Sequence, residues 1–248
     1  MQRYFLTTPL AAAELILPVE MYKHAITVLR MKIGTTFEVV TPDEVIHCMK
    51  LVAIKNKQAI AVEVKNYKNN VELPVDATII CGLPKGDKAD FIVQKGTELG
   101  AKHFIFFESD YSIAKWDKKK VAKKLTRLSK IAQGAAEQSH RLVIPTVEYL
   151  EDLAQLIVPN ATTCITAYEE EAKKGEASKF SKLVTNLKSK DKENIFAVFG
   201  PEGGISKQEI KILVDKGFIA VGLGPRIMRA ETAPLYFLAA LSFGLELA

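Results

Sequence analysis

The chain has 248 residues, 48% hydrophobic and 25% charged, a balance typical of a globular protein that folds around its own core. No apolar run reaches the roughly 18 residues of a membrane span, and the first residues do not have the pattern of a signal peptide, so a membrane protein and an exported protein are not expected. Cys48, Cys81 and Cys164 lack paired spacing, which argues against a zinc site or a disulfide framework and favours a reducing, cytoplasmic location.

The formal net charge of +5 is unevenly distributed along the chain. Between Ile113 and Arg141, nine Lys and Arg residues stand against two acidic residues, a local excess larger than that of the whole chain. Such a segment suits a polyanionic partner such as nucleic acid. A solvated helix face explains it about equally well.

The first 70 residues are expected to form a small β-rich unit. Runs rich in β-branched residues and bounded by turn residues predict strands at Thr35–Pro42, Val45–Ile54 and Ala59–Tyr67. A short helix is predicted before them at Glu20–Met31. The stretch Lys68–Pro74, with Asn-Asn and Pro, is predicted to be a linker.

After Pro74, short apolar segments alternate with longer amphipathic ones, which indicates a parallel sheet covered by helices on both faces. The predicted strands are Ala77–Leu83, His103–Glu108, Thr162–Ala167, Ile195–Gly200 and Ile219–Gly224. The predicted helices are Asp87–Leu99, Asp117–Gln138, Ala177–Leu187, Lys207–Lys216 and the almost wholly apolar Leu235–Leu247. Ligands of such sheets bind beyond the carboxyl ends of the strands, so a binding site is expected in the loops that follow strands.

The helix Lys207–Lys216 has the clearest predicted boundaries. Ser206 and Glu209 have the spacing of a capping box, and Gly217 follows the last turn. The loop Gly200–Ile205 therefore joins a strand end to a firmly capped helix.

The loop that begins "FGPEGG" (Phe199–Gly204) does not suit a phosphate. Glu202 would repel one, and no lysine follows at the position that a phosphate-binding loop requires. Gly200, Gly203 and Gly204 allow unusual backbone angles and the close approach of a ligand that is neutral or partly cationic.

A second glycine loop, "GLGPRIMRAETAP" (Gly222–Pro234), follows the next predicted strand and carries Arg226, Arg229 and Glu231. Two such loops at successive strand ends are expected to face each other across a crevice.

With these two loops the chain resembles the SPOUT superfamily of methyltransferases. Within it, the chain is similar to the family that methylates N3 of a uridine in 16S ribosomal RNA. The resemblance extends over nearly the whole chain. Its further supporting stretches are Arg3–Phe5, His24–Gly34, Pro84–Ala101 and Lys130–Arg141.

The resemblance implies an α/β fold with a PUA-like RNA-binding β-barrel over residues 1–70 and a SPOUT domain over residues 74–248. That domain would have a parallel sheet and a deep trefoil knot. The methyl donor would be S-adenosylmethionine, bent between the two glycine loops, with no metal. The partners would be 16S ribosomal RNA in the small subunit and a second copy of the chain, joined through the C-terminal helix; no membrane is implied.

The resemblance also implies roles for single residues. Arg229 would stabilise charge on a carbonyl oxygen of the uridine or anchor a phosphate. Glu231 and Glu202 are candidate bases or orienting groups, although an ion pair to Arg226 or Arg229 explains Glu231 as well. The expected donor contacts are Gly200, Glu202, Gly203, Leu223, Gly224, Ile227 and Met228. The expected RNA contacts are Arg3, His24, Arg30, Lys85, Lys88 and Arg141.

The chain departs from the family pattern at Gly96, Met228 and Ala230, where the family tends to have Ala, Leu and Thr. Ala230 lacks the hydroxyl of threonine, so its side chain cannot make a hydrogen bond that the family would make at that position. Two alternatives also stay open: a related methyltransferase for another ribosomal or transfer RNA nucleotide, and a non-catalytic RNA-binding protein.

Overall fold

The structure is a computed structural model that describes residues 1–170, 178–188 and 193–248. The chain divides into two compact units. The N-terminal unit comprises Met1–Glu72 and Ala136–Val143, and the C-terminal unit comprises Leu73–Ala135 and Ile144–Ala248. The first boundary lies inside the stretch predicted to be a linker, whereas the return of the chain at 136–143 has no signal in the sequence.

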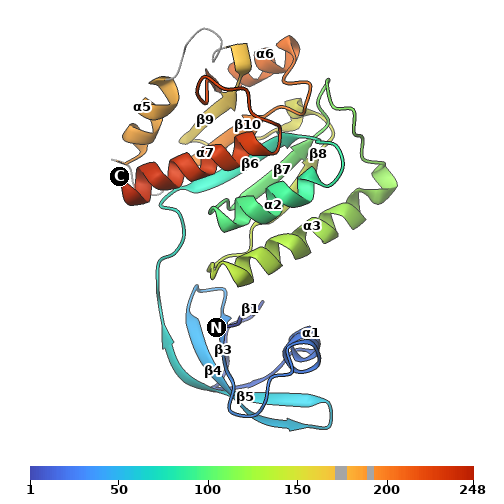
Figure 1. Ribbon diagram of the computed structural model, residues 1–248, viewed down its shortest axis with the longest axis vertical. Helices are drawn as coiled ribbons and strands as arrows, with labels where there is room; N and C mark the ends of the chain where they lie inside the picture. The colour runs from blue at the N-terminus through green and yellow to red at the C-terminus, as the bar shows by residue number, and fades with distance from the viewer. Residues whose placement is uncertain (171–177, 189–192) are drawn as a thin grey trace. The chain divides into compact units, whose positions relative to one another are not determined.

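The N-terminal unit is built on a five-stranded mixed sheet with the order β1-β3-β4-β5-β2 (Figure 1). β1 pairs in parallel with β3, and the other neighbours are antiparallel. The three predicted strands are confirmed, and two three-residue strands at the ends of the sheet were missed. The strands are β1 (Arg3–Phe5), β2 (Glu14–Ile16), β3 (Thr36–Val40), β4 (Ile46–Lys55) and β5 (Gln58–Tyr67).

The helix predicted at Glu20–Met31 is shorter in the structure. It consists of α1 (Val19–Tyr22) and a wider π-type turn, η1 (Lys23–Val28). Met21 and Ala25 turn into the core of the sheet, where Phe37 is fully buried. In the π-type turn Leu29 N donates to the carbonyl of His24, five residues back. The helix ends before Arg30, whose φ of +53° is left-handed.

The C-terminal unit contains a six-stranded sheet with the order β11-β9-β10-β6-β7-β8, in which every pair is parallel. The strands are β6 (Asp76–Gly82), β7 (His103–Phe107), β8 (Thr146–Leu150), β9 (Thr162–Ala167), β10 (Asn194–Phe199) and β11 (Ile219–Val221). Five of them confirm the predicted strands. The sixth, β8, was missed because it is an edge strand whose sequence, TVEYL, includes an exposed glutamate.

Helices cover both faces of this sheet. Neighbouring residues of β6 point to opposite sides: Ile79 packs in the core that includes side chains of α2, α3, α5 and α7, whereas Ile80 packs with Leu213 of α6. Figure 1 shows α2 and α7 side by side. The helices are α2 (Lys88–Glu98), α3 (Lys118–Gln138), α5 (Ser178–Leu187), α6 (Lys207–Asp215) and α7 (Thr232–Ser242), with short turns η2 (Leu153–Gln155) and η3 (Phe243–Leu247).

The predicted capping of α6 is confirmed. The Ser206 side chain accepts a hydrogen bond from Glu209 N, and the Glu209 carboxylate accepts one from Ser206 N. Gly217 follows the last turn with a φ of +88°. Position 177, the predicted first residue of α5, lies outside the described residues.

The last helix is only partly covered. Phe237, Leu238 and Leu241 are fully buried, but Phe243 and Leu247 are 61% and 76% exposed. This apolar segment was expected to be buried on most sides. Within a single chain, only one face of α7 is buried. Across the described parts of the chain, no helix has the length and apolar character needed to cross a bilayer.

Candidate functional site

A cavity of about 600 Å³ opens at the carboxyl ends of β9, β10 and β11. The glycine loop after β10 forms one wall and the glycine loop after β11 forms another, and residues that follow β9 complete it. The order of the sheet explains this arrangement, because β9 lies between β10 and β11 and both loops leave the sheet beside its end. The volume is within the range of small-molecule sites.

The loop after β10 is a tight turn that only glycine can form. A Cβ on Gly200 would lie 2.6 Å from the carbonyl carbon of Gly204, and Gly204 N donates to the Pro201 carbonyl at 2.9 Å. Gly204 itself has a φ of +79°, with no atom within 4 Å of the position of a Cβ. The turn therefore holds its backbone bare on the cavity side.

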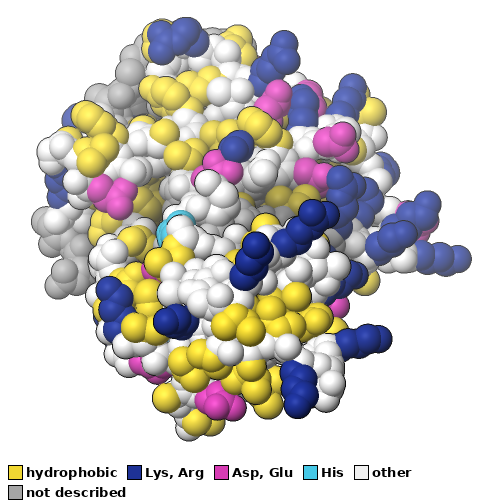
Figure 2. All heavy atoms as spheres, turned by 60° about the horizontal axis from the view of Figure 1, so that its bottom comes forward, with side chains coloured by type: hydrophobic (Ala, Val, Ile, Leu, Met, Phe, Trp, Pro, Cys, Tyr) yellow, Lys and Arg dark blue, Asp and Glu magenta, His cyan; other side chains and the backbone are white. Residues whose placement is uncertain are grey.

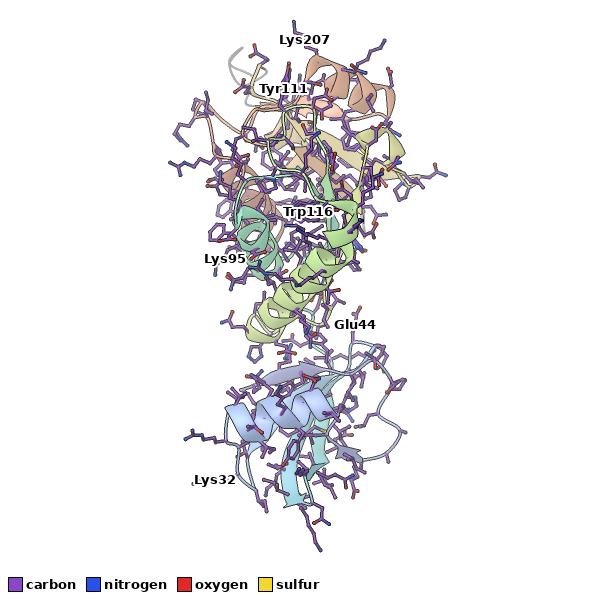
Figure 3. The ribbon with its side chains drawn as sticks, turned by 90° about the vertical axis from the view of Figure 1, so that its right-hand side faces the viewer. Lys32, Glu44, Lys95, Tyr111, Trp116 and Lys207 are labelled. Atoms are coloured by element: carbon purple, nitrogen blue, oxygen red, sulfur yellow. The ribbon has the colours of Figure 1, made fainter. Side chains whose placement is uncertain are left out.

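Gly203 has a different use from the one expected. It is not among the residues that line the cavity, and a Cβ there would lie 2.7 Å from Cβ of Tyr111, a residue labelled in Figure 3. The absence of a side chain at Gly203 lets the loop pack against Tyr111, so its contribution to the site is indirect.

The opposite wall comes from the loop after β11. Leu223, Gly224, Ile227 and Met228, four of the residues predicted to contact the donor, line the cavity. Ile227 is 77% exposed, an unusual position for an aliphatic side chain at the mouth of a cavity. This wall offers apolar surface next to free backbone groups.

Lys88, from the first turn of α2, joins the two loops. Its Nζ lies 2.8 Å from Oε1 of Glu202 in the first loop and 2.9 Å from Oε2 of Glu231 in the second. Lys85 N also donates to Glu202 Oε1, at 3.2 Å. The sequence pointed to Lys88 as an RNA contact and did not reveal this bridging position.

The bridge sets the charge state of both carboxyls. Burial acts to raise the pKa of Glu202 and of Glu231, but hydrogen bonds from Lys88 and from backbone N–H groups, together with the nearby positive charge, outweigh burial and leave each pKa below its ordinary value. The same hydrogen bonds raise the pKa of Lys88. At neutral pH all three groups are charged, and a carboxylate with a lowered pKa is a weak base.

Arg229 lines the cavity and is exposed. Its charge contributes to the lowered pKa of Glu231, but within the described residues no carboxylate forms an ion pair with Arg229 or with Arg226. The expected alternative, a Glu231–arginine ion pair, is replaced by the pair with Lys88. The Arg229 guanidinium is thus available to an anionic or carbonyl-bearing ligand.

Two of the arginines expected to contact RNA are buried in the N-terminal unit. Arg3 is 4% exposed and donates to Glu38 Oε2 from Nε at 3.0 Å and from Nη2 at 2.8 Å. Arg141 is 3% exposed and its Nε donates to Glu72 Oε2 at 3.0 Å. With their guanidinium groups enclosed by protein acceptors, these residues hold the unit together and do not present a surface to phosphate.

The remaining expected RNA contacts divide in the same way. Nδ1 of His24 lies 3.1 Å from the hydroxyl of Tyr4, so this ring is anchored in its own unit. Burial, with the nearby charge of Glu137, raises the pKa of Tyr4 to about 12, so its hydroxyl stays protonated. Arg30 and Lys85 are exposed and remain able to meet RNA.

One part of the cavity lining was not expected from the sequence. Ala167, the last residue of β9, lines the cavity together with Tyr168 and Glu169, which follow the strand. The available signal was the predicted strand Thr162–Ala167, since ligands sit beyond the ends of parallel strands. In the described parts of the chain, no group of three or more His, Cys, Asp or Glu side chains is arranged to hold a metal ion.

Comparisons with known proteins identify the family. Residues 71–242 match the family model of the RNA methyltransferase domain. The chain is 39% identical to ribosomal RNA small subunit methyltransferase E of Bacillus subtilis, over 100% of this chain and 98% of that protein. It is 30% identical to the protein of the same name from Buchnera aphidicola, over 88% of this chain and 84% of that one.

Solved structures agree with these relatives. The structure of ribosomal RNA small subunit methyltransferase E from Neisseria gonorrhoeae bound to S-adenosyl methionine has a TM-score of 0.82 and 28% identity, covering 98% of this chain and 97% of that chain. A methyltransferase from Legionella pneumophila in complex with the same cofactor also has a TM-score of 0.82, with 26% identity and coverage of 97% and 96%. The chain belongs to the ribosomal RNA small subunit methyltransferase E family.

Proposed function

We propose that this protein transfers a methyl group from S-adenosylmethionine to N3 of a specific uridine in the 16S ribosomal RNA of the small subunit. The observation that carries the proposal is the cavity between the two glycine loops, in a chain whose structural relatives include two proteins bound to this donor. The same proposal places the protein in the cytoplasm, where its RNA substrate is.

The residues of the cavity suit the donor. Leu223, Ile227 and Met228 offer an apolar wall to the adenine, and the bare backbone at Gly204 and Gly224 can approach the ribose. The two carboxylates and one ammonium of the Glu202–Lys88–Glu231 bridge leave an excess of negative charge, which is complementary to a sulfonium. When bound, the donor supplies an electrophilic methyl group.

In this proposal, Arg229 is the catalytic residue that stabilises the uridine anion. Uridine N3 first loses its proton to solvent, and the negative charge of the resulting anion spreads onto the neighbouring carbonyl oxygens. The N3 lone pair then attacks the methyl carbon, the sulfur–methyl bond breaks, and S-adenosylhomocysteine leaves as 3-methyluridine forms. A guanidinium beside one of these oxygens stabilises the anion and so makes the N3 proton more acidic. Glu231, with its lowered pKa, is better suited to hold Lys88 than to act as the base.

The finer features of the fold also belong to this proposal. The resemblance of the sequence supports a PUA-like barrel for the N-terminal unit and a trefoil knot for the C-terminal unit. The homodimer through the C-terminal helix is supported by the apolar side chains that a single chain leaves exposed there, Tyr236, Phe243 and Leu247.

The test is direct. Purified protein is incubated with methyl-labelled S-adenosylmethionine and small ribosomal subunits that lack their methylation, and the RNA is digested to identify the labelled nucleoside. Label in 3-methyluridine supports the proposal. Label in another nucleoside overturns the choice of substrate, and an absence of both label and donor binding by calorimetry overturns the function.

Arg229→Ala tests the catalytic assignment, with Arg226→Ala as the matched control from the same loop. We expect the rate of methyl transfer by Arg229→Ala at saturating substrates to fall by about 10²–10³-fold, as for loss of one oxyanion-stabilising group. Donor affinity should stay within a few fold of the parent protein. Equal losses in the two variants would contradict the specific role of Arg229.

A further inference from the structure

α3 is a 21-residue helix with strongly unequal faces. Leu128 and Ala132 are buried in the core of the C-terminal unit. The exposed side carries lysine and arginine at a density found nowhere else in the sequence. The exposed basic residues of the helix are Lys118, Lys119, Lys120, Lys123, Lys124, Arg127 and Lys130.

Three of these side chains have partners within the protein. Lys118 pairs with Glu151 at 2.7 Å, Arg127 pairs with Asp90, and Lys124 lies 5.2 Å from the centre of the Trp116 ring, which is labelled in Figure 3. The other four have no carboxylate partner among the described residues. We call these four the α3 basic face: Lys119, Lys120, Lys123 and Lys130.

The α3 basic face lies along one side of the helix. At 100° per residue, Lys119, Lys123 and Lys130 fall within about 40° of one another around the helix axis, and they extend about 16 Å along it. Lys120 flanks this row on the next ridge. In Figure 2, Lys and Arg side chains gather at the right-hand edge, on the side where Figure 1 shows the first turns of α3.

Helix stability does not explain this pattern. Lys119 and Lys123 repel each other at a spacing of four residues, as do Lys120 and Lys124. The first turn contains lysines and no acidic residue, although the positive end of the helix dipole disfavours cations there. The arrangement opposes folding of the helix, and a bound polyanion would relieve the repulsion.

We propose that the α3 basic face binds the phosphate backbone of the RNA substrate. Lysine is depleted in the cores of protein interfaces, where aromatic residues are enriched, and α3 exposes no large hydrophobic side chain. Lysine side chains commonly contact phosphate oxygens. Such contacts contribute affinity and fix the position of the protein on the nucleic acid, but they do not distinguish one base from another. A strip about 16 Å long spans several phosphates of an RNA strand. This inference rests on the proposed function, because that function identifies RNA as the polyanion that the lysines would bind.

The test compares two triple variants with the same change in net charge. Lys119→Glu/Lys123→Glu/Lys130→Glu reverses the row, and Lys182→Glu/Lys207→Glu/Lys211→Glu reverses three exposed lysines of α5 and α6 in the same unit. Binding to unmethylated 16S ribosomal RNA is measured against salt concentration. We expect the slope of log affinity against log salt to fall by about one per lysine in the row variant, with affinity at least tenfold weaker at 0.1 M salt. The control variant should lose less than threefold.

A neutral variant, Lys119→Gln/Lys123→Gln/Lys130→Gln, separates lost contacts from repulsion by new carboxylates. It should give about the same change in slope as the glutamate variant. The thermal midpoint of the neutral variant should not fall, because like-charge repulsion between positions 119 and 123 is removed. Donor affinity by calorimetry should be unchanged in both row variants. Equal slopes for the row and control variants overturn the proposal, and so does a neutral variant that binds RNA like the parent.

These outcomes are distinct from a failure of the proposed function. If the parent protein labels 3-methyluridine but the row variant binds RNA as the control does, the α3 basic face is wrong and the function stands. If the row variant alone loses RNA affinity but no nucleoside is labelled, the function is wrong and the surface stands.

Discussion

The N-terminal and C-terminal units use cationic side chains in opposite ways. Arg3 and Arg141 of the N-terminal unit are almost fully enclosed, each against a carboxylate of the same unit. Arg229 of the C-terminal unit is exposed at a cavity and pairs with no carboxylate in the part of the chain that the structure describes. Lys88 is shared between two loops that line or flank that cavity. Similar residues are thus enclosed by carboxylates in one unit and line a cavity in the other.

The difference shows that residue type and motif alone do not separate a structural cation from a functional one. A buried guanidinium has lost its water and depends on its carboxylate, so removal of either partner leaves an uncompensated charge. An exposed cation keeps its water and contributes little to stability, so it is free to meet a ligand. Three predictions test the difference between the two units.

The largest expected effect is on the N-terminal unit. Arg3→Ala leaves the Glu38 carboxylate in a buried position without its guanidinium, and we expect a loss of about 3–5 kcal/mol in the free energy of unfolding of this unit. Thiol labelling at increasing urea concentration measures this loss of stability, because buried Cys48 reacts only when the N-terminal unit unfolds. Cys81 and Cys164 report in the same way on the C-terminal unit. Burial raises the pKa of Cys164 to about 11 and that of Cys81 further, so both thiols stay protonated in the folded unit.

The control is Lys50→Ala on β4, an exposed cation whose loss should change stability by less than about 0.5 kcal/mol. Cys48 should become reactive at lower urea in Arg3→Ala, with Cys81 and Cys164 unchanged. If Arg3→Ala and Lys50→Ala behaved alike, the contrast between buried and exposed cations would not hold.

An intermediate effect is expected at the cavity. Gly200→Ala places a methyl group 2.6 Å from the backbone of Gly204, and overpacking of this kind costs about 1–3 kcal/mol. Because the strain falls on the turn that lines the cavity, donor affinity measured by calorimetry should weaken by about tenfold or more.

Gly134→Ala is the matched control for this substitution. Position 134 lies in α3 with no atom within 4 Å of the new Cβ, so alanine should stabilise the helix by roughly 1 kcal/mol and leave donor binding unchanged. Unaltered donor affinity in Gly200→Ala would remove the loop after β10 from the proposed binding site.

The smallest effect concerns the bridge of Lys88. The folded protein holds the pKa of Glu202 and Glu231 below the ordinary value of 4.5, so these ion pairs stabilise it above that pH, and the stabilisation is lost as the pH falls through the lowered values. Lys88→Met removes this contribution, which we expect to be about 1 kcal/mol or less at pH 7 for partly exposed groups.

Thermal midpoints between pH 7 and pH 3 measure the effect. The parent protein should lose more stability on acidification than Lys88→Met, so the two curves converge at low pH. Lys95→Met, which breaks an exposed pair with Glu98 on the same helix, should follow the parent more closely. Parallel curves for the parent and Lys88→Met would show that the bridge does not set the two carboxyl pKa values.

Many of the helices and strands can be predicted from the sequence, because their formation depends on local patterns of residues. The apolar runs of β6, β7, β9, β10 and β11, and the capping box of Ser206 and Glu209, involve neighbours only a few residues apart. Three strands were missed for a physical reason. β1 and β2 have three residues each, too few for an alternating pattern, and β8 is an edge strand with exposed polar positions.

The sequence by itself determined the parallel α/β architecture, the positions of the two glycine loops and the concentration of lysine on one helix. Only the tertiary structure decided which cations are enclosed and which carboxylates they meet. Arg3 finds Glu38 at a separation of 35 residues, and Lys88 finds Glu202 at a separation of 114. Desolvation and ion pairing depend on atoms brought together by the whole fold, and a local pattern of residues carries no record of them.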